Sequence, residues 1–306
     1  MVSVIIPCFN VENYIEDCLS SVYSQSYKQF EVICIDNNSK DDTLSKIRAL
    51  KTELYPDLIV LQELKSGACA ARNKGLINAK GEWIQFLDAD DILKPLKLEH
   101  QIELLKSKKA ISFVAGAAEY VSIKEEVKVV IPQDVECFVA MFSCELGNTC
   151  SNLWNKGVLN SVKGWNEDLS SSQETDLMFR ILVLGIGVIV DTKPLTMIYE
   201  RTSGQISQSN PINRWSNFIE VRLKMLAEIK LSHPKTFTTH QSDFETFLLS
   251  SIVILGKYDR IKALDFLNKY NFNYKTILPK YGIGRKTLFC FKVFGPKTTF
   301  MIYSKR

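Results

Sequence analysis

Short apolar runs alternate with segments of helical periodicity through the first half of the chain. The runs are short, continuous and rich in Val, Ile or aromatic residues, so each predicts a strand: residues 2–7, 31–36, 58–63 and 82–88. The segments between them repeat apolar residues every three or four positions, which predicts helices: residues 11–25, 40–50 and 67–79. A helix between successive strands is typical of a parallel sheet with helices on both faces. The expected fold class is therefore α/β, with a mostly parallel central sheet flanked by helices.

The pattern becomes less regular in the second half of the chain. Residues 111–123 predict a strand, 175–185 predict a helix and 188–192 predict another strand. From about residue 212 onward the signals are helical at first and then irregular and basic. We therefore expect two domains, an α/β domain at 1–212 and a helical region with a basic amphipathic tail at 213–306.

The net charge of +4 is distributed unevenly along the 306 residues. Residues 266–306 contain nine Lys or Arg and no Asp or Glu, so the rest of the chain carries 4 − 9 = −5. Within this tail, residues 285–306 interleave aromatic and aliphatic side chains with the cations, a composition that suits an anionic membrane surface. The alternative is a tail that packs back on the domain and exposes ordinary lysines. No nucleic-acid motif accompanies the tail, so we expect no nucleic-acid partner.

Composition also limits the compartment and the kinds of metal site. The N-terminus lacks the basic region and cleavage site of a secretory signal, and the longest apolar runs, 181–190 and 247–255, are too short to span a bilayer. The eight cysteines form no CxxC pair and only three histidines occur, so zinc spacing is absent and the thiols fit a reducing compartment. With the basic tail, this predicts a cytoplasmic protein that is peripheral on the inner face of the cell membrane.

The stretch "FLDADDILKP" places Asp88, Asp90 and Asp91 directly after a predicted strand. Carboxylates at this spacing suit a hard divalent cation such as Mg²⁺ or Mn²⁺, often together with phosphate oxygens of a substrate. The alternative is that Asp90 or Asp91 simply caps the helix that begins near Pro95. Polar side chains also end the other predicted strands, and ligands collect at the carboxyl ends of strands in such sheets: Asn10, Asp36 and Asp88.

Three segments carry a family resemblance: "VSVIIPCFNVENYIEDCLSSVYSQSYKQFEVICIDNNSKDDT", "GACAARNKGLINAKGEWIQFLDADD" and "SSQETDLMFRIL". They resemble the family 2 glycosyltransferases with the GT-A fold, of the type that builds bacterial surface polysaccharide. The resemblance covers residues 1 to about 205. It implies that 1–212 is a nucleotide-sugar-binding and catalytic domain, and that the enzyme transfers a sugar with inversion to a hydroxyl of a saccharide acceptor, one that is lipid-linked. Residues 213–306 carry no matching motif.

The resemblance also implies roles on the nucleotide side of the site. Pro7 and Phe9 would lie against the base, and Asp36 would accept a hydrogen bond from uracil, which implies a UDP-sugar donor. Arg72 would lie near the base and the diphosphate. Arg201 stands where the family often has a metal-binding His, and it would contact the diphosphate instead.

The remaining implied roles concern the metal and the acceptor. Asp88 would face the ribose or a metal-bound water, and Asp90 would ligate Mn²⁺ or Mg²⁺. Glu174 holds the position of the general base, although the family's Glu-Asp pair is Gln-Glu here; without the resemblance it would be an acid placed favourably at a helix N-terminus. Trp165 matches an aromatic position beside the acceptor.

Two other functions use a similar scaffold. A nucleotidyltransferase would need a glycine-rich phosphate loop after the first strand, and "PCFNVEN" contains no glycine. A non-catalytic nucleotide-sugar-binding module would have no need to keep all four implied carboxylates: Asp36, Asp88, Asp90 and Glu174.

Overall fold

The structure is a computed structural model of the chain, and it describes residues 1–306 except 107, 109, 202–209, 282 and 304–306. The described residues form two compact units, Met1–Thr202 and Ser203–Arg306.

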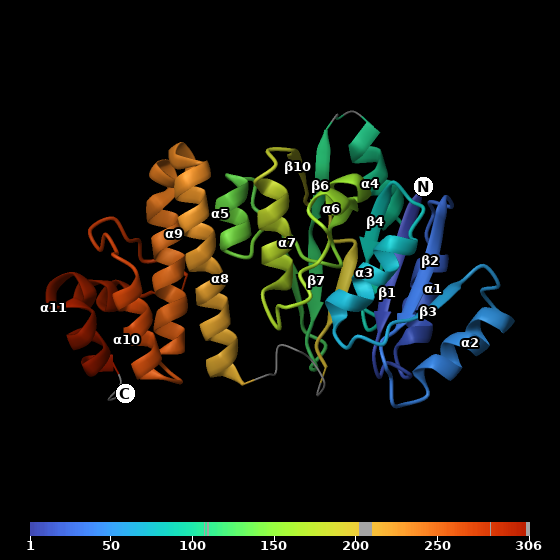
Figure 1. Ribbon diagram of the computed structural model, residues 1–306, viewed down its shortest axis with the longest axis horizontal. Coiled ribbons are helices and arrows are strands. Elements are labelled where there is room, and N and C mark those ends of the chain that lie inside the picture. Colours follow the sequence, from blue (N-terminus) through green and yellow to red (C-terminus); the bar gives the residue numbers. More distant parts are fainter. Residues whose placement is uncertain (107, 109, 202–209, 282, 304–306) are drawn as a thin grey trace. The chain divides into compact units, whose positions relative to one another are not determined.

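A seven-stranded sheet forms the centre of the first unit (Figure 1). Its strands run in the order β10-β6-β9-β4-β1-β2-β3, and β9 alone is antiparallel to its neighbours. The mostly parallel central sheet is thus confirmed, whereas β9 has no counterpart among the predicted strands. The bounds are β1 (Val2–Cys8), β2 (Phe30–Asp36), β3 (Ile59–Gln62), β4 (Trp83–Phe86), β6 (Ile111–Gly116), β9 (Leu153–Asn155) and β10 (Gly187–Asp191).

Helices cover both faces of the sheet because successive side chains of a strand point to opposite faces. On β1, Val4 and Ile6 belong to the core cluster that also contains Cys18 and Leu19 of α1. Ile5, between them, packs on the other face against α3. The helices of this unit are α1 (Ile15–Tyr23), α2 (Thr43–Glu53), α3 (Ala68–Asn78), α4 (Lys97–Lys106), α5 (Cys137–Phe142), α6 (Lys156–Ser161) and α7 (Gln173–Leu182).

The strand predicted at 111–123 is two strands in two different sheets. β6 ends at Gly116, which pairs with Asp191 of β10 while its N–H bonds the Asn152 side chain at 3.0 Å. The chain then continues as β7 in a four-stranded sheet of order β5-β11-β7-β8. The strands of this second sheet are β5 (Ile92–Leu93), β7 (Ala118–Val121), β8 (Val127–Val130) and β11 (Thr196–Tyr199).

The second unit is helical in its described part. Its helices are α8 (Pro211–Ser232), α9 (Pro234–Leu255), α10 (Arg260–Lys269) and α11 (Arg285–Tyr303). The prediction of an irregular tail is therefore wrong over α11. Leu288 and Phe291 are buried there, and the ring of Phe291 stacks on that of Tyr274 with 5.8 Å between the ring centroids. Gly295, at φ 75°, interrupts this helix. None of the described helices is long and apolar enough to cross a membrane.

Gly75 lets α3 approach the sheet closely. A Cβ atom there would lie 2.3 Å from Cγ2 of Ile5 and 2.9 Å from Cδ1 of Ile35. Because Ile5 is β-branched and buried, its side chain cannot turn aside without cost.

We therefore predict that Gly75→Ala lowers the free energy of unfolding by about 1–3 kcal/mol through overpacking, measured as a lower urea midpoint of the first unit. Gly157→Ala is the control, because Gly157 is exposed on α6 and the nearest atom to its added Cβ, Asn155 Oδ1, lies 3.2 Å away. Equal midpoints for the two variants would contradict the close approach of α3.

Candidate active site

The carboxyl ends of β1, β2 and β4 meet at one edge of the central sheet. The register pairs Cys8 with Asp36, and the N–H of Leu87 bonds the carbonyl of Ile5, so Asp88 follows directly after the strand ladder. The sequence prediction that these strand ends deliver polar groups to one edge is confirmed by this arrangement. This edge is the place where a ligand of a parallel sheet is expected to bind.

Asp36 offers a buried acceptor at this edge. Its side chain is 3% exposed, and no described residue donates a hydrogen bond to its Oδ1. Pro7 lies on the neighbouring strand, and Phe9 is 55% exposed just beyond it. A buried oxygen without a donor costs free energy unless a ligand supplies one. The carboxyl end of β2 therefore fits a ligand that carries an N–H.

Two arginines neutralise part of the charge of the aspartates after β4. Nη2 of Arg72 lies 2.7 Å from Oδ1 of Asp88, and Nε of Arg201 lies 2.5 Å from Oδ2 of Asp90. Asp91 is buried and accepts the N–H of Tyr199 at 3.1 Å. The three carboxylates thus hold partners other than the N-terminus of α4, which argues against the helix-cap interpretation.

The three aspartates carry more negative charge than the two arginines beside them can neutralise. Burial raises the pKa of Asp90, and repulsion by Asp88 adds to this, while Arg201 opposes the shift. Burial and the charges of Asp88 and Asp90 raise the pKa of Asp91 well above its ordinary value. The cluster therefore favours any bound cation, which would relieve the repulsion among the three carboxylates.

Trp165 lies inside the first unit, which differs from its expected place beside an acceptor. It is 2% exposed, with the guanidinium of Arg72 4.7 Å from its ring centroid and Phe86 packed edge-on at 5.2 Å. A ring platform for a sugar needs an open face, and this ring has none. Trp165 instead supports Arg72, which in turn holds Asp88.

Glu174 stands in the first turn of α7, well separated in sequence from the aspartates. Its Oε2 accepts two hydrogen bonds from Thr149, one from the backbone N–H and one from Oγ1 at 2.6 Å. Burial raises the pKa of Glu174, and the two bonds from Thr149 and the charge of Arg72 act against this rise. Cys150, the residue after Thr149, accepts the N–H of Asp88 at 3.3 Å, so two adjacent residues link Glu174 to the aspartate cluster.

Arg180 braces the start of this helix. It bonds Oδ2 of Asp176 through Nε at 2.9 Å, and its Nη1 donates to the carbonyls of Val162 and Gly164. The loop before α7 is thereby tied to the helix that carries Glu174.

The loop 148–150 reaches the site because of strand β9, and sequence analysis missed both. β9 pairs antiparallel with β4, with Ile84 opposite Trp154, and the same register continued beyond the strands brings Cys150 opposite Asp88. The N–H of Asp88 indeed bonds Sγ of Cys150 at 3.3 Å. The one available signal was the polar run "NTCSN" at 148–152, which resembles an ordinary loop.

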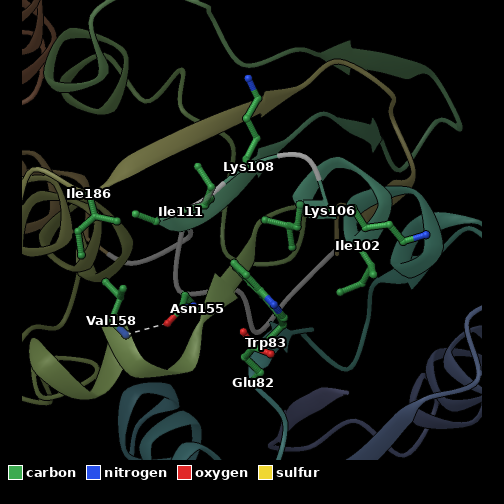
Figure 2. Close-up of a pocket in the computed structure, with 11 residues that line it drawn as sticks. Glu82, Trp83, Ile102, Lys106, Lys108, Ile111, Asn155, Val158 and Ile186 are labelled. Atoms are coloured by element: carbon green, nitrogen blue, oxygen red, sulfur yellow. Dashed lines mark hydrogen bonds between the residues drawn. The ribbon is translucent and has the colours of Figure 1, made fainter.

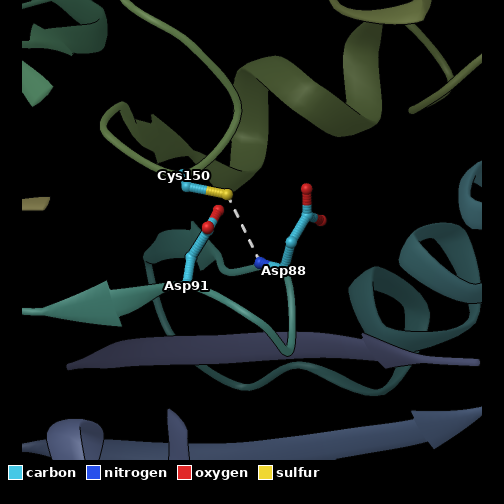
Figure 3. A group of neighbouring side chains, drawn as sticks. All are labelled: Asp88, Asp91 and Cys150. Carbon is cyan, nitrogen blue, oxygen red and sulfur yellow. Dashed lines mark hydrogen bonds between the residues drawn. The ribbon is translucent and has the colours of Figure 1, made fainter. Parts of the chain in front are cut away.

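Oxygen ligands for a hard cation are present in this cluster. Three possible ligand atoms lie within 4.8 Å of one another: a carboxylate oxygen of Asp88, a carboxylate oxygen of Asp91 and Sγ of Cys150. Figure 3 shows the Asp91 carboxyl directed at Cys150. The Asp88 side chain is 40% exposed. Asp90, which the sequence analysis expected to ligate the metal, is not a member of this group and pairs with Arg201. Carboxylate oxygens that carry excess negative charge fit Mg²⁺ or Mn²⁺.

A cavity of about 430 Å³ opens at the opposite edge of the sheet, where β4 and β6 begin (Figure 2). Its lining is largely apolar, and the ammonium groups of Lys106 and Lys108 point away from it. Lys106 pairs instead with Glu103. Among its described lining residues, no set of polar groups converges on this cavity, so it is not a candidate active site.

The comparison with protein families matches residues 3–138 to the family "Glycosyl transferase family 2". The chain is 35% identical over 148 residues to the UDP-Glc:alpha-D-GlcNAc-diphosphoundecaprenol beta-1,3-glucosyltransferase WfgD of Escherichia coli. The matched residues are 48% of this chain and 57% of WfgD. The chain is 40% identical over 117 residues to the putative teichuronic acid biosynthesis glycosyltransferase TuaG of Bacillus subtilis, 37% of this chain and 45% of that protein. The chain thus spans less than two thirds of the length of these curated relatives.

Solved structures show the same fold. The TarS 1-349 fragment of S. aureus in complex with UDP-GlcNAc superposes with a TM-score of 0.74 at 17% identity, over 99% of this chain and 90% of that chain. The mannosyltransferase PcManGT of Pyrobaculum calidifontis, in complex with GDP-Man and Mn²⁺, superposes with a TM-score of 0.56 at 18% identity, over 88% of this chain and 78% of that one. The expected GT-A fold is confirmed by the match to TarS.

Proposed function

We propose that this protein, whose residues 3–138 belong to glycosyl transferase family 2, transfers a sugar from a UDP-sugar to a hydroxyl group of a saccharide with inversion at the sugar carbon. The observation that carries the proposal is one half-buried carboxylate, Glu174, that stands apart from a separate acidic cluster at the same edge of the sheet. Inverting transfer needs these two kinds of group, one for the acceptor proton and one for the leaving diphosphate.

The donor side of the proposal rests on Asp36. The N3–H of uracil is the donor that its buried Oδ1 lacks among the described residues. Cytosine has no N–H at that position, so a CDP-sugar would leave the carboxylate unpaired. Pro7 and Phe9 would contact the base, and Arg72 and Arg201 would face the diphosphate.

Asp88 and Asp90 would hold Mg²⁺ or Mn²⁺ together with the diphosphate oxygens. The cation supplies positive charge to the leaving group as negative charge develops there. Support comes from the aspartate cluster itself, where burial and then the repulsion of the neighbouring carboxylates raise the pKa values of Asp90 and Asp91.

Glu174 would act as the base. It would take the proton of the acceptor hydroxyl while that oxygen forms a bond to the sugar carbon, and the bond from this carbon to the diphosphate would break with its electrons on the leaving oxygen. The burial that raises the pKa of Glu174 makes it a stronger base than an exposed glutamate.

The acceptor in this proposal is a lipid-linked saccharide of a surface polysaccharide. The names of the relatives support it, since WfgD is named for a diphosphoundecaprenol-linked acceptor and TuaG for teichuronic acid biosynthesis. Such an acceptor lies at the inner face of the cell membrane, where this protein would be peripherally bound.

A panel of sugar nucleotides, offered with a membrane extract that contains lipid-linked saccharides, tests the reaction. We expect release of UDP from a UDP-sugar, loss of this release in excess chelator and its return with Mn²⁺ or Mg²⁺. By calorimetry, UDP should bind more tightly than CDP.

Each part of the proposal has a result that contradicts it. Full turnover in excess chelator excludes the metal, and equal affinities for UDP and CDP exclude the role of Asp36. Release of pyrophosphate would indicate a nucleotidyltransferase, and binding of sugar nucleotides without any release would indicate a binding module.

Glu174→Gln should lower kcat by two to four orders of magnitude, about the usual contribution of a positioned base. The affinity for UDP should stay unchanged, because the base contacts the acceptor hydroxyl and not the nucleotide. Turnover and calorimetry on the same preparation measure both effects.

Asp176→Asn is the matched control, since Asp176 is also an acid in the first turn of α7 and pairs with Arg180. It should lower the melting temperature and leave most of the turnover. If Glu174→Gln keeps near-native turnover and Asp176→Asn loses it, the base is Asp176 and not Glu174.

The membrane contact in this proposal is assigned to residues 266–306, and one face of α11 supports it. Between residues 285 and 293 of this helix the exposed positions recur at helical spacing, and each of them is basic or apolar: Arg285, Lys286, Phe289, Lys292 and Val293. Phe289 is 60% exposed and Val293 55% exposed, next to cations and without an acidic residue on the helix. An apolar strip between cations suits the headgroup region of an anionic bilayer.

Replacing Lys286 and Lys292 together by Gln should weaken binding to vesicles of anionic lipid by roughly 30-fold, because each lysine near the surface contributes about 1 kcal/mol to the free energy of binding. Sedimentation with vesicles measures the affinity. The same double change at the exposed Lys224 and Lys235, on α8 and α9, is the control and should have little effect. Equal losses in both variants, or no binding by the unchanged protein, would contradict this role of α11.

A further inference from the structure

Thr149 holds one oxygen of Glu174 with two donors. Its backbone N–H and its Oγ1 both bond Oε2, the hydroxyl at 2.6 Å, and no described residue donates to Oε1. Thr149 is 9% exposed, so water competes little for these donors. The two oxygens of the carboxylate are therefore not equivalent.

The backbone of Thr149 is itself held in place. Its carbonyl accepts a hydrogen bond from Nε1 of the buried Trp154, at 3.5 Å. On one side, Oδ1 of Asn148 accepts the N–H groups of Cys150 and Ser151, each at 2.9 Å. Because these hydrogen bonds hold the loop, the donors of Thr149 keep their direction whether Glu174 is charged or neutral.

We propose that Thr149 is a positioning residue for Glu174, which clamps Oε2 so that Oε1 is the oxygen that receives the acceptor proton. This inference rests on the proposed base role of Glu174. It adds that the loop before β9, and not only helix α7, sets the direction of the carboxylate.

The clamp also sets the ionisation of the base. A hydrogen bond to the charged form of a carboxylate favours that form, so Thr149 lowers the pKa of Glu174 against the rise caused by burial. Three other charged or titratable groups act on Glu174 from elements around it: Arg72 on α3 lowers its pKa, Asp88 after β4 raises it, and Tyr120 on β7 interacts with it. Removal of the Thr149 hydroxyl should therefore raise the pKa of Glu174.

The same loop touches the other parts of the site. Nδ2 of Asn148 donates to the Tyr120 hydroxyl at 3.1 Å, and Sγ of Cys150 accepts the N–H of Asp88. Three consecutive residues thus contact Tyr120, the candidate base and the aspartate cluster. The side chain of Thr149 can be changed without removing the contacts that Asn148 and Cys150 make.

Thr149→Val removes the hydroxyl and keeps the shape of the side chain and the backbone N–H. The acid limb of the pH profile of kcat/KM should move to higher pH, because a base with a higher pKa is deprotonated only at higher pH. On that limb kcat/KM should fall on the order of tenfold, as for loss of a hydrogen bond to a charged group. The alkaline plateau and the affinity for UDP should change little.

Thr149→Ser restores the hydroxyl and should restore the profile. If Thr149→Val is not folded by thermal melting, Thr149→Ala serves in its place, since it also removes the hydroxyl. A pH profile that is the same with and without the hydroxyl would overturn the proposal and leave Thr149 a structural residue.

Carbon NMR of the Glu174 carboxyl, assigned by its absence in Glu174→Gln, measures the same titration without turnover. A higher titration midpoint in Thr149→Val supports the clamp, and an unchanged midpoint overturns it. If the unchanged protein transfers no sugar from any donor, the proposed function fails, and this titration still decides whether Thr149 controls Glu174.

Discussion

Mutual repulsion among three carboxylates at the end of a buried strand is the constraint on which this edge of the fold depends. Asp88, Asp90 and Asp91 lie within the five residues after β4, and the fold places the guanidinium groups of Arg72 and Arg201 against two of them. Two cations do not balance three carboxylates, and the pKa values of Asp90 and Asp91 stay raised. A cluster with excess charge is unfavourable for folding and favourable for binding a cation, as is common where activity requires local destabilisation.

The aromatic core beneath the cluster keeps these charges in place. Arg72 lies over the ring of Trp165, which packs against Phe86 at the end of β4, so the cation that neutralises Asp88 is held from below by buried rings. Trp154 of β9 extends the same core, stacking on Phe113 and bonding the carbonyl of Thr149. One apolar layer therefore orients both the acidic cluster and the loop that bonds Glu174.

The single antiparallel strand makes this arrangement possible. A sheet of parallel strands alone would bring only strand ends to this edge, and each would come from its own βα unit. β9 runs the other way between β4 and β6, so the loop that leads into it arrives at the carboxyl end of β4. Thr149 and Cys150 meet Glu174 and Asp88 for this reason.

The sequence by itself determined the α/β class, the parallel strands and the residues at their ends, because apolar periodicity and strand-end polar groups are local properties. It indicated the resemblance to family 2 glycosyltransferases for the same reason, since each motif, around Asp36, Asp88 or Glu174, is a short continuous stretch. Only the tertiary structure decided which side chains meet: Arg201 with Asp90, Thr149 with Glu174, and Trp165 with Arg72 inside the unit. It also decided that α11, over residues 285–293, buries Leu288 and Phe291 and exposes basic and apolar side chains. These outcomes depend on long-range strand pairing and burial, and no short window of sequence carries that information.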